Sequence, residues 1–365
     1  MPKDSLNPYC NASLLSTLKR KEMHMKSKLS ILFFCIVFLA AGYGWAAETL
    51  TVCSYGGTYN KGLEETIGKP FTAATGIDVV FTTFPSYAQM KAQVDSGNVE
   101  WDVVEAESRM FFRGVKNDLF EPLDLSAVPQ KDFIEGSVTP YGVGLIYYSY
   151  MITYNTDKWP AGTGPKSMKE LWDVKKFPGP RVMRIYAASN LEAALLADGV
   201  PRDKIYPIDF DRAMKKLTEL KPHIRVYWKS GGQSQQIIRE KEADVGFVPG
   251  GRMMQLMDQG VPVAVEWNDQ IIVLDYWTVL KGSKKKDAAM KFIAFASDAK
   301  RQAAFAEWTN YGPANKKAYD HISPKKAVMM PTYPENFAKG LVINAEWYAE
   351  NEEEVERRWE AWKME

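Results

Sequence analysis

Two arginines in the chain stand where they could bind an anion. Arg184 lies near the end of a predicted strand, and Arg252 opens a predicted helix. The planar guanidinium group of arginine binds carboxylate or phosphate oxygens two at a time. Gly56-Gly57 and residues 230–232 (Ser-Gly-Gly) stand at predicted helix starts, where free backbone N–H groups favour an anion. The pattern predicts a ligand that carries an anionic group.

Each of these features also has a purely structural interpretation. Arg184 could pair with a nearby acid such as Glu192, and Arg252 with Asp258. The first glycine pair could simply permit a tight turn, because glycine adopts positive φ angles at little cost. These alternatives stay open at the level of the sequence.

Residue sets for catalysis are missing. Beyond the leader described below, the histidines are His223 and His321, and the one cysteine is Cys53. No Gly-x-Ser-x-Gly, His-Glu-x-x-His or Cys-x-x-Cys pattern occurs. We therefore predict a binding protein without a cofactor or a metal, and not an enzyme. An exported enzyme on the same scaffold stays as the alternative of another class.

The N-terminal part of the chain has the pattern of an export signal. Two lysines precede the apolar run Ile31–Ala41, and small residues follow at Gly44 and Ala46. The run is too short for a membrane-spanning helix, which needs about 20 apolar residues. The pattern predicts a leader of residues 1–46 that contains a cleaved signal peptide from Met25 to Ala46, and hence a periplasmic protein.

The composition suits a freely diffusing binding protein. The whole chain has a formal charge of +1, and the leader carries an excess of basic residues, so the exported part is slightly acidic. This balance gives no reason to expect a nucleic-acid partner. Cys53 alone follows the leader, so no intrachain disulfide can form. We expect a monomer stabilised by packing.

Strand and helix patterns alternate along the chain and predict two α/β lobes with parallel sheets. In the first lobe, the predicted strands are 50–53, 77–81 and 102–104, and the predicted helices are 61–75, with an interruption at 68–70, and 87–96. In the second lobe, the predicted strands are 181–185, 224–228 and 245–247, and the predicted helices are 167–174, 190–198, 209–221, 233–240 and 252–259.

Two long apolar and aromatic runs, Val143–Tyr154 and Ile271–Leu280, separate these lobes. We interpret them as crossing strands that form a hinge. The predicted helices 286–295 and 298–308 then return to the first lobe, and 346–364 is a terminal helix. The predicted organisation is 47–142 with 281–322 as lobe 1, 143–154 with 271–280 as hinge strands, 155–270 as lobe 2, and 323–365 as a C-terminal segment packed on the lobes.

The order of several short motifs resembles a known family. They are Gly62-Leu63-Glu64, Phe71 to Ile77, Trp101 to Val104, Pro140-Tyr141-Gly142, Leu171-Trp172 and Tyr311 to Asn315. Each motif is weak alone, but their order over about residues 50–322 resembles the spermidine/putrescine-type periplasmic solute-binding proteins of bacterial ABC importers. The resemblance implies the type II periplasmic binding protein fold, in which the ligand is caught between two lobes as a hinge closes.

The resemblance also implies a position for the ligand site. Polyamine-binding members hold the ligand's methylenes in an aromatic box and its amines with carboxylates; Tyr55 and Asp275 match that pattern. Tyr186 and Ser189 stand where other acids of the pattern would be. The candidate ligand-binding residues are Tyr55, Gly56, Gly57, Glu107, Arg184, Tyr186, Ser189, Gly251, Arg252, Asp275 and Trp277.

A polycation fits poorly beside two arginines, because like charges repel more strongly as water is excluded. Asp275, together with either Glu105 or Glu107, could still bind an amine; we expect only one of these two glutamates to face the cleft. We therefore predict a zwitterionic or carboxylate-bearing amine as ligand, with a polyamine as the alternative. The implied partners are a membrane permease and its ATPase.

Overall fold

The computed structural model describes residues 48–83 and 85–365. The predicted signal peptide lies outside the described residues. None of the described helices combines the length and the apolar character that a bilayer crossing requires.

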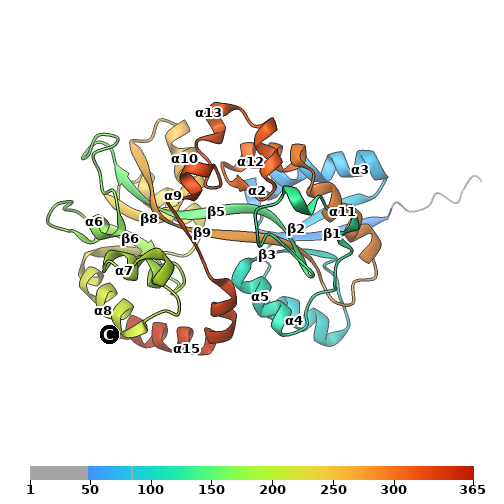
Figure 1. The fold of residues 1–365 in the computed structure, drawn as a ribbon, viewed down its shortest axis with the longest axis horizontal. Helices are drawn as coiled ribbons and strands as arrows, with labels where there is room; N and C mark the ends of the chain where they lie inside the picture. The colour runs from blue at the N-terminus through green and yellow to red at the C-terminus, as the bar shows by residue number, and fades with distance from the viewer. Residues whose placement is uncertain (1–47, 84) are drawn as a thin grey trace, which may run out of the picture. The chain divides into compact units, whose positions relative to one another are not determined.

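The described residues form one sheet with the strand order β2-β1-β3-β9-β5-β8-β6-β7 (Figure 1). The strands of this path are β1 (Thr49–Ser54), β2 (Asp78–Thr83), β3 (Val103–Glu107), β5 (Gly142–Asn155), β6 (Arg181–Arg184), β7 (Ile224–Trp228), β8 (Val245–Pro249) and β9 (Val263–Val279). Strands β2, β1 and β3 pair in parallel, as do β8, β6 and β7. The two parallel groups flank the antiparallel pair β9 and β5. The predicted α/β architecture with two crossing strands is confirmed.

Lobe 1, as we use the term, is built around a hydrophobic core on β1, β2, β3 and the first part of β5. Its helices are α2 (Gly57–Leu63), α3 (Lys69–Thr75), α4 (Tyr87–Ser96), α5 (Ser108–Lys116), α11 (Lys286–Ala296) and α12 (Ala299–Thr309). The ring of Phe71 on α3 meets that of Phe292 on α11 edge-on, whereas Phe111 on α5 stacks on Tyr276 of β9. Helices α2, α3, α11 and α12 thus lie on one side of the sheet, and α4 and α5 on the other (Figure 1).

Lobe 2 has its own hydrophobic core around β6, β7 and β8. Its helices are α6 (Met168–Trp172), α7 (Asn190–Ala197), α8 (Phe210–Leu220), α9 (Gly231–Arg239) and α10 (Gly250–Asp258). Helix α7 is buried along its whole length, which explains why its residues other than Asn190 and Glu192 are apolar. Three helices begin at caps that sequence reading can recognise: Ser167, Asp209 and Ser230 each accept a hydrogen bond from the backbone three residues on.

The hinge contains a third segment that the sequence did not indicate. After the short elements α13 (Pro324–Ala327) and α14 (Pro334–Phe337), the strand β11 (Leu341–Val342) pairs with β9 at Ile271 and Ile272. The chain then enters α15 (Ala345–Met364). The remaining short strands, β4 (Val138–Thr139) and β10 (Gly312–Pro313), both pair with β5. The short strand β11 is thus a further segment of the hinge region, beside the two predicted crossing strands.

One helix was not predicted, and two local predictions need correction. Helix α5 was not predicted, because its sequence follows β3 directly and Glu107 itself caps it by accepting from the Arg109 backbone. The interruption expected at 68–70 is instead a π-helical turn, Glu64–Gly68, that joins α2 to α3. Strand β9 begins at Val263 rather than Ile271, because polar residues in its first half find partners: Glu266 pairs with Lys166.

Candidate ligand-binding site

Arg184 leaves the end of β6 and lies among aromatic rings. Its guanidinium carbon is 4.7 Å from the ring centre of Tyr150, 5.0 Å from that of Tyr186 and 5.8 Å from that of Trp228. These rings stabilise its charge through cation–π contact. Its Nε atom is buried without a hydrogen-bond partner, and none of the ion pairs among the described residues includes it. Arg184 is therefore available for an anion.

The structural alternatives for the two arginines do not hold. Glu192, the expected partner of Arg184, is fully buried and accepts hydrogen bonds from Tyr206 and Tyr348 instead. Asp258, the expected partner of Arg252, lies 3.8 Å from the ammonium group of Lys326. In the part of the chain that the structure describes, neither Arg184 nor Arg252 forms the ion pair that the structural interpretation requires.

Arg252 lies on the first turn of α10 beside Tyr311: burial raises the pKa of the Tyr311 hydroxyl, and the positive charge of Arg252 opposes that rise. Two glycines make this contact possible. A Cβ atom on Gly231 would come within 3.0 Å of Arg252 Nε, and one on Gly251 would come within 2.4 Å of the Tyr311 ring. Gly251, predicted as a ligand contact, thus has a steric role: it lets the aromatic ring lie against the backbone.

Asp275 supplies an acidic group. It is 2% exposed, and its Oδ1 atom accepts a long hydrogen bond of 3.4 Å from the Tyr55 hydroxyl. Among the described residues, no lysine or arginine pairs with it. Burial, and then the negative charges of Glu105 and Glu107, hold the pKa of Asp275 well above its usual range. A cationic group beside Asp275 would offset the free-energy cost of ionising this buried carboxyl group.

Glu105 and Glu107 act on Asp275 together, which corrects the expectation that only one of them faces this region. Residues two apart on a strand share a face. Glu105 is fully buried, and its carboxylate accepts hydrogen bonds from Ser54, at 2.5 Å, and from Tyr59. Glu107 stands opposite Asp275 in the β3–β9 register and pairs with Arg109 at 3.0 Å. Asp275 is the carboxylate of this group that lacks a close partner.

A series of tyrosines joins Asp275 to Arg184. Each ring centre lies within 6.3 Å of the next, in the order Tyr55, Tyr59, Tyr311, Tyr148 and Tyr150. Burial raises the pKa of all five hydroxyls, so they remain neutral hydrogen-bond donors at physiological pH. We call the set Tyr55, Tyr59, Tyr148, Tyr150, Arg184, Arg252, Asp275 and Tyr311 the hinge cluster.

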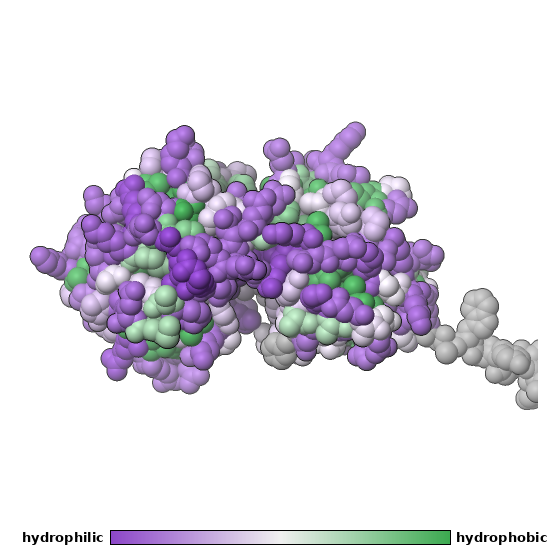
Figure 2. Space-filling model, turned by 90° about the horizontal axis from the view of Figure 1, so that it is seen from below, coloured by the Kyte–Doolittle hydropathy of each residue, from purple (hydrophilic) through white to green (hydrophobic). Residues whose placement is uncertain are grey.

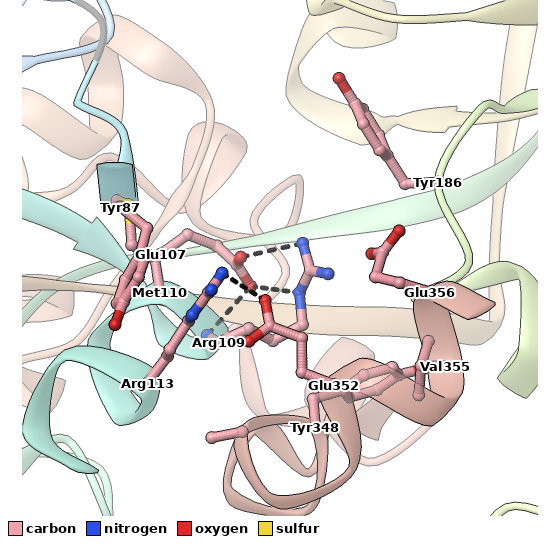
Figure 3. A pocket seen from close by; sticks show the side chains of 11 residues that line it. Tyr87, Glu107, Arg109, Met110, Arg113, Tyr186, Tyr348, Glu352, Val355 and Glu356 are labelled. Carbon is pink, nitrogen blue, oxygen red and sulfur yellow. Dashed lines mark hydrogen bonds and ion pairs between the residues drawn. The ribbon is translucent and has the colours of Figure 1, made fainter. Parts of the chain in front are cut away.

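Four of the predicted residues, Tyr55, Arg184, Arg252 and Asp275, belong to the hinge cluster. Tyr186 and Glu107 border it: both line a pocket of about 400 Å³ whose other walls come from α4, α5 and α15 (Figure 3). Tyr186 is 46% exposed, so it can reach a molecule in that pocket.

The remaining predicted residues contribute little to the cluster. Gly56 donates its N–H to Asn60 at 2.8 Å and has a φ of 82°, so it serves the turn and not an anion. Gly57 is exposed. Ser189 is fully buried and donates to the Ala188 carbonyl, 2.5 Å away. Trp277 is fully buried against Phe292 in the lobe 1 core.

Sequence reading missed Tyr59, Tyr148, Tyr150 and Tyr311. A signal for two of them was present, because Tyr148 and Tyr150 stand two apart on a predicted crossing strand and must share a face. Tyr311 lies within a motif that carried the family resemblance. The hinge cluster as a whole offers a carboxylate on lobe 1, a guanidinium on lobe 2 and aromatic walls between them. This arrangement suits a small molecule with an amine at one end and an acid at the other.

The chain is similar to proteins that bind small solutes. A family model described as "Bacterial extracellular solute-binding protein" matches residues 66–332. The γ-aminobutyric acid-binding protein of Pseudomonas aeruginosa is 35% identical over 346 residues, which cover 93% of this chain and 97% of that protein. The spermidine/putrescine-binding periplasmic protein of Escherichia coli is 23% identical over 76% of this chain and 81% of its own length. The solved structure of the Atu4243 GABA receptor has a TM-score of 0.81 and 39% identity, covering 86% of this chain and 97% of that one.

Proposed function

Because the chain belongs to the bacterial extracellular solute-binding protein family, we propose that it captures γ-aminobutyric acid or a closely related amino acid with separated charges. The ligand's carboxylate would meet Arg184, and its amine would meet Asp275. The observation that carries this proposal is a buried acidic group on lobe 1, Asp275, and a guanidinium group on lobe 2, Arg184, whose Nε atom is buried without a hydrogen-bond partner, with tyrosine rings between them. Two relatives of more than 30% identity are named for this ligand.

Capture between lobes follows from where the charges lie. Arg184 belongs to lobe 2, and Asp275 lies where β9 meets β3 of lobe 1. A ligand that contacts both favours the arrangement in which they are close, and it can shift the lobes only by that preference. An amino acid whose two charges are separated by several methylenes meets this condition, with its chain against the tyrosine rings.

A polyamine fits the hinge cluster less well. A diamine that reached Asp275 would place its second ammonium group near Arg184 or Arg252, where like charges repel. The polyamine-binding relative is also more distant, at 23% identity. Asp275 and Tyr55 remain the two positions that match the polyamine pattern.

Binding without chemistry is part of the proposal. Burial and the charge of Glu105 raise the pKa of the Cys53 thiol to about 12, so it does not form a reactive thiolate. His223 and His321 are exposed and lie outside the hinge cluster. The protein would deliver its ligand unchanged, as a monomer, to a permease driven by an ATPase.

The ligand proposal is tested with three four-carbon compounds that differ in their end groups and hence in charge: γ-aminobutyric acid, butyrate and putrescine. At about 100 times its dissociation constant, a ligand stabilises the folded state by about 2.7 kcal/mol. For a chain of this size that shift is roughly 4 °C in Tm. We expect γ-aminobutyric acid to produce it and the other two compounds to produce far less. Stabilisation by putrescine but not by γ-aminobutyric acid would contradict the proposal.

Export is predicted from the leader, whose residues lie outside the described structure. When the full chain is expressed with its leader in a Gram-negative host, the periplasmic product should begin at Ala47 or Glu48. N-terminal sequencing of that fraction is the measurement. A product that keeps Met1 and stays in the cytoplasm would contradict both the cleavage and the periplasmic localisation.

A further inference from the structure

The C-terminal helix α15 is anchored in lobe 2. Four of its side chains, Tyr348, Val355, Trp359 and Trp362, are at most 4% exposed and belong to the lobe 2 core. Three of these also make hydrogen bonds to that lobe: Tyr348 to Glu192 at 2.8 Å, Trp359 to the Ile185 carbonyl at 2.8 Å, and Trp362 to Thr218 at 2.9 Å. Burial of this much aromatic surface holds α15 to lobe 2.

Helix α15 also packs along α5 of lobe 1, where its side-chain contacts are polar and partly exposed. Arg113 on α5 pairs with Glu352 on α15 at 2.5 Å, and Lys116 donates to the Ala349 carbonyl at 3.2 Å. The side chains of Arg113 and Glu352 are 37% and 36% exposed. Figure 3 shows both reaching across the pocket from opposite helices, and Figure 2 shows mainly hydrophilic side chains on this side of the molecule. Exposed polar contacts form and break far more easily than a buried aromatic anchor.

Helix α15 is also tied directly to the ligand-binding segment. Trp359 donates its hydrogen bond to the carbonyl of Ile185, and Ile185 stands between Arg184 and Tyr186 in the sequence. Arg109, which pairs with Glu107, lies 5.7 Å from the ring centre of Tyr348. One helix therefore connects α5 of lobe 1 with the strand end that presents Arg184.

We propose that α15 is a latch: lobe 2 carries it, and the Arg113–Glu352 ion pair fastens it to α5 when the lobes close. The latch raises ligand affinity without contacting the ligand, because it lowers the free energy of the closed arrangement alone. The latch depends on the proposed function in one respect only, namely that a ligand binds between the two lobes. Helix α15 itself stays on lobe 2 as the lobes separate.

The test uses Glu352→Gln and Arg113→Gln in the mature protein. Each variant should weaken γ-aminobutyric acid binding by about two- to fivefold at low salt, the range of an exposed ion pair. The double variant should be no weaker than the Arg113 variant, because the two changes remove one interaction. The matched control is Glu360→Gln, which removes an ion pair that α15 makes with its own Lys363 at 2.7 Å. It should leave affinity unchanged.

A second readout does not depend on the ligand's identity. Spin labels are attached to two introduced cysteines at exposed positions, Ala92→Cys on α4 and Lys215→Cys on α8, and report the distance between the lobes. The native Cys53 is buried, so the label should not react with it. Without added ligand, Glu352→Gln should move the distance distribution toward longer values, and Glu360→Gln should not. The latch is wrong if Glu352→Gln matches the parent protein in this distribution. If the parent protein binds no γ-aminobutyric acid, the ligand proposal fails but the distance measurement still decides the latch.

Discussion

Replacing Arg184 by alanine is expected to remove most of the affinity for γ-aminobutyric acid while leaving the protein folded. Loss of one partner of a buried, hydrogen-bonded charge pair costs about 2–5 kcal/mol of binding free energy, which is roughly thirtyfold or more in Kd. The fold should tolerate the change, because Arg184 makes no ion pair with the described residues and its Nε atom is unpartnered. Calorimetric titration together with a melting curve measures both effects.

Two control variants distinguish the role of the Arg184 guanidinium group from that of positive charge alone. Arg225→Ala removes an exposed arginine from a neighbouring strand of the same lobe and should leave binding unchanged. Arg184→Lys keeps the charge but loses the planar fork, so its affinity should fall between that of the parent protein and that of Arg184→Ala. Unaltered affinity of Arg184→Ala for γ-aminobutyric acid would show that the carboxylate binds elsewhere, with Arg252 as the next position to test.

The alternation of strands and helices was readable from sequence because it depends on local periodicity. The strands 181–185 and 224–228 differ from β6 and β7 by at most one residue. The third hinge segment was not readable, because β11 is two residues long and exists only by pairing with β9. The first half of β9 was also missed, since Glu266 and Asp269 resemble a loop until their partners Lys166 and Arg202 are known.

Parts of the site were predictable for a similar reason. Arg184 and Asp275 stand out as charges in apolar surroundings, and such charges need partners or a ligand. Trp277 lies two residues from Asp275 and shares its strand face, but the Phe292 ring on α11 covers it. Whether a helix or a cleft covers a given position on a strand depends on distant segments, and no local pattern in the sequence reports it.

The second large effect is expected from Asp275→Asn, which should remove the preference for an amine. In the parent protein the ligand's ammonium group favours the ionised form of the Asp275 carboxylate. Removal of this carboxylate should again cost about 2–5 kcal/mol of binding free energy. Butyrate, which has no amine, should bind both proteins equally weakly. The exposed change Asp203→Asn is the matched control.

The pH dependence tests the same carboxylate independently. Burial raises the folded-state pKa of Asp275 above its unfolded value. Between these two pKa values, the folded chain without ligand keeps a proton that the unfolded chain has already lost. Its contribution to stability is thus full below the unfolded pKa and is lost as pH rises through the folded pKa. Ligand affinity should change in the opposite direction, rising with pH as Asp275 ionises. In Asp275→Asn both trends should become shallower without vanishing, because burial also raises the pKa of Glu105. A variant that keeps the full pH dependence of affinity would assign the amine to Glu105 or Glu107 instead.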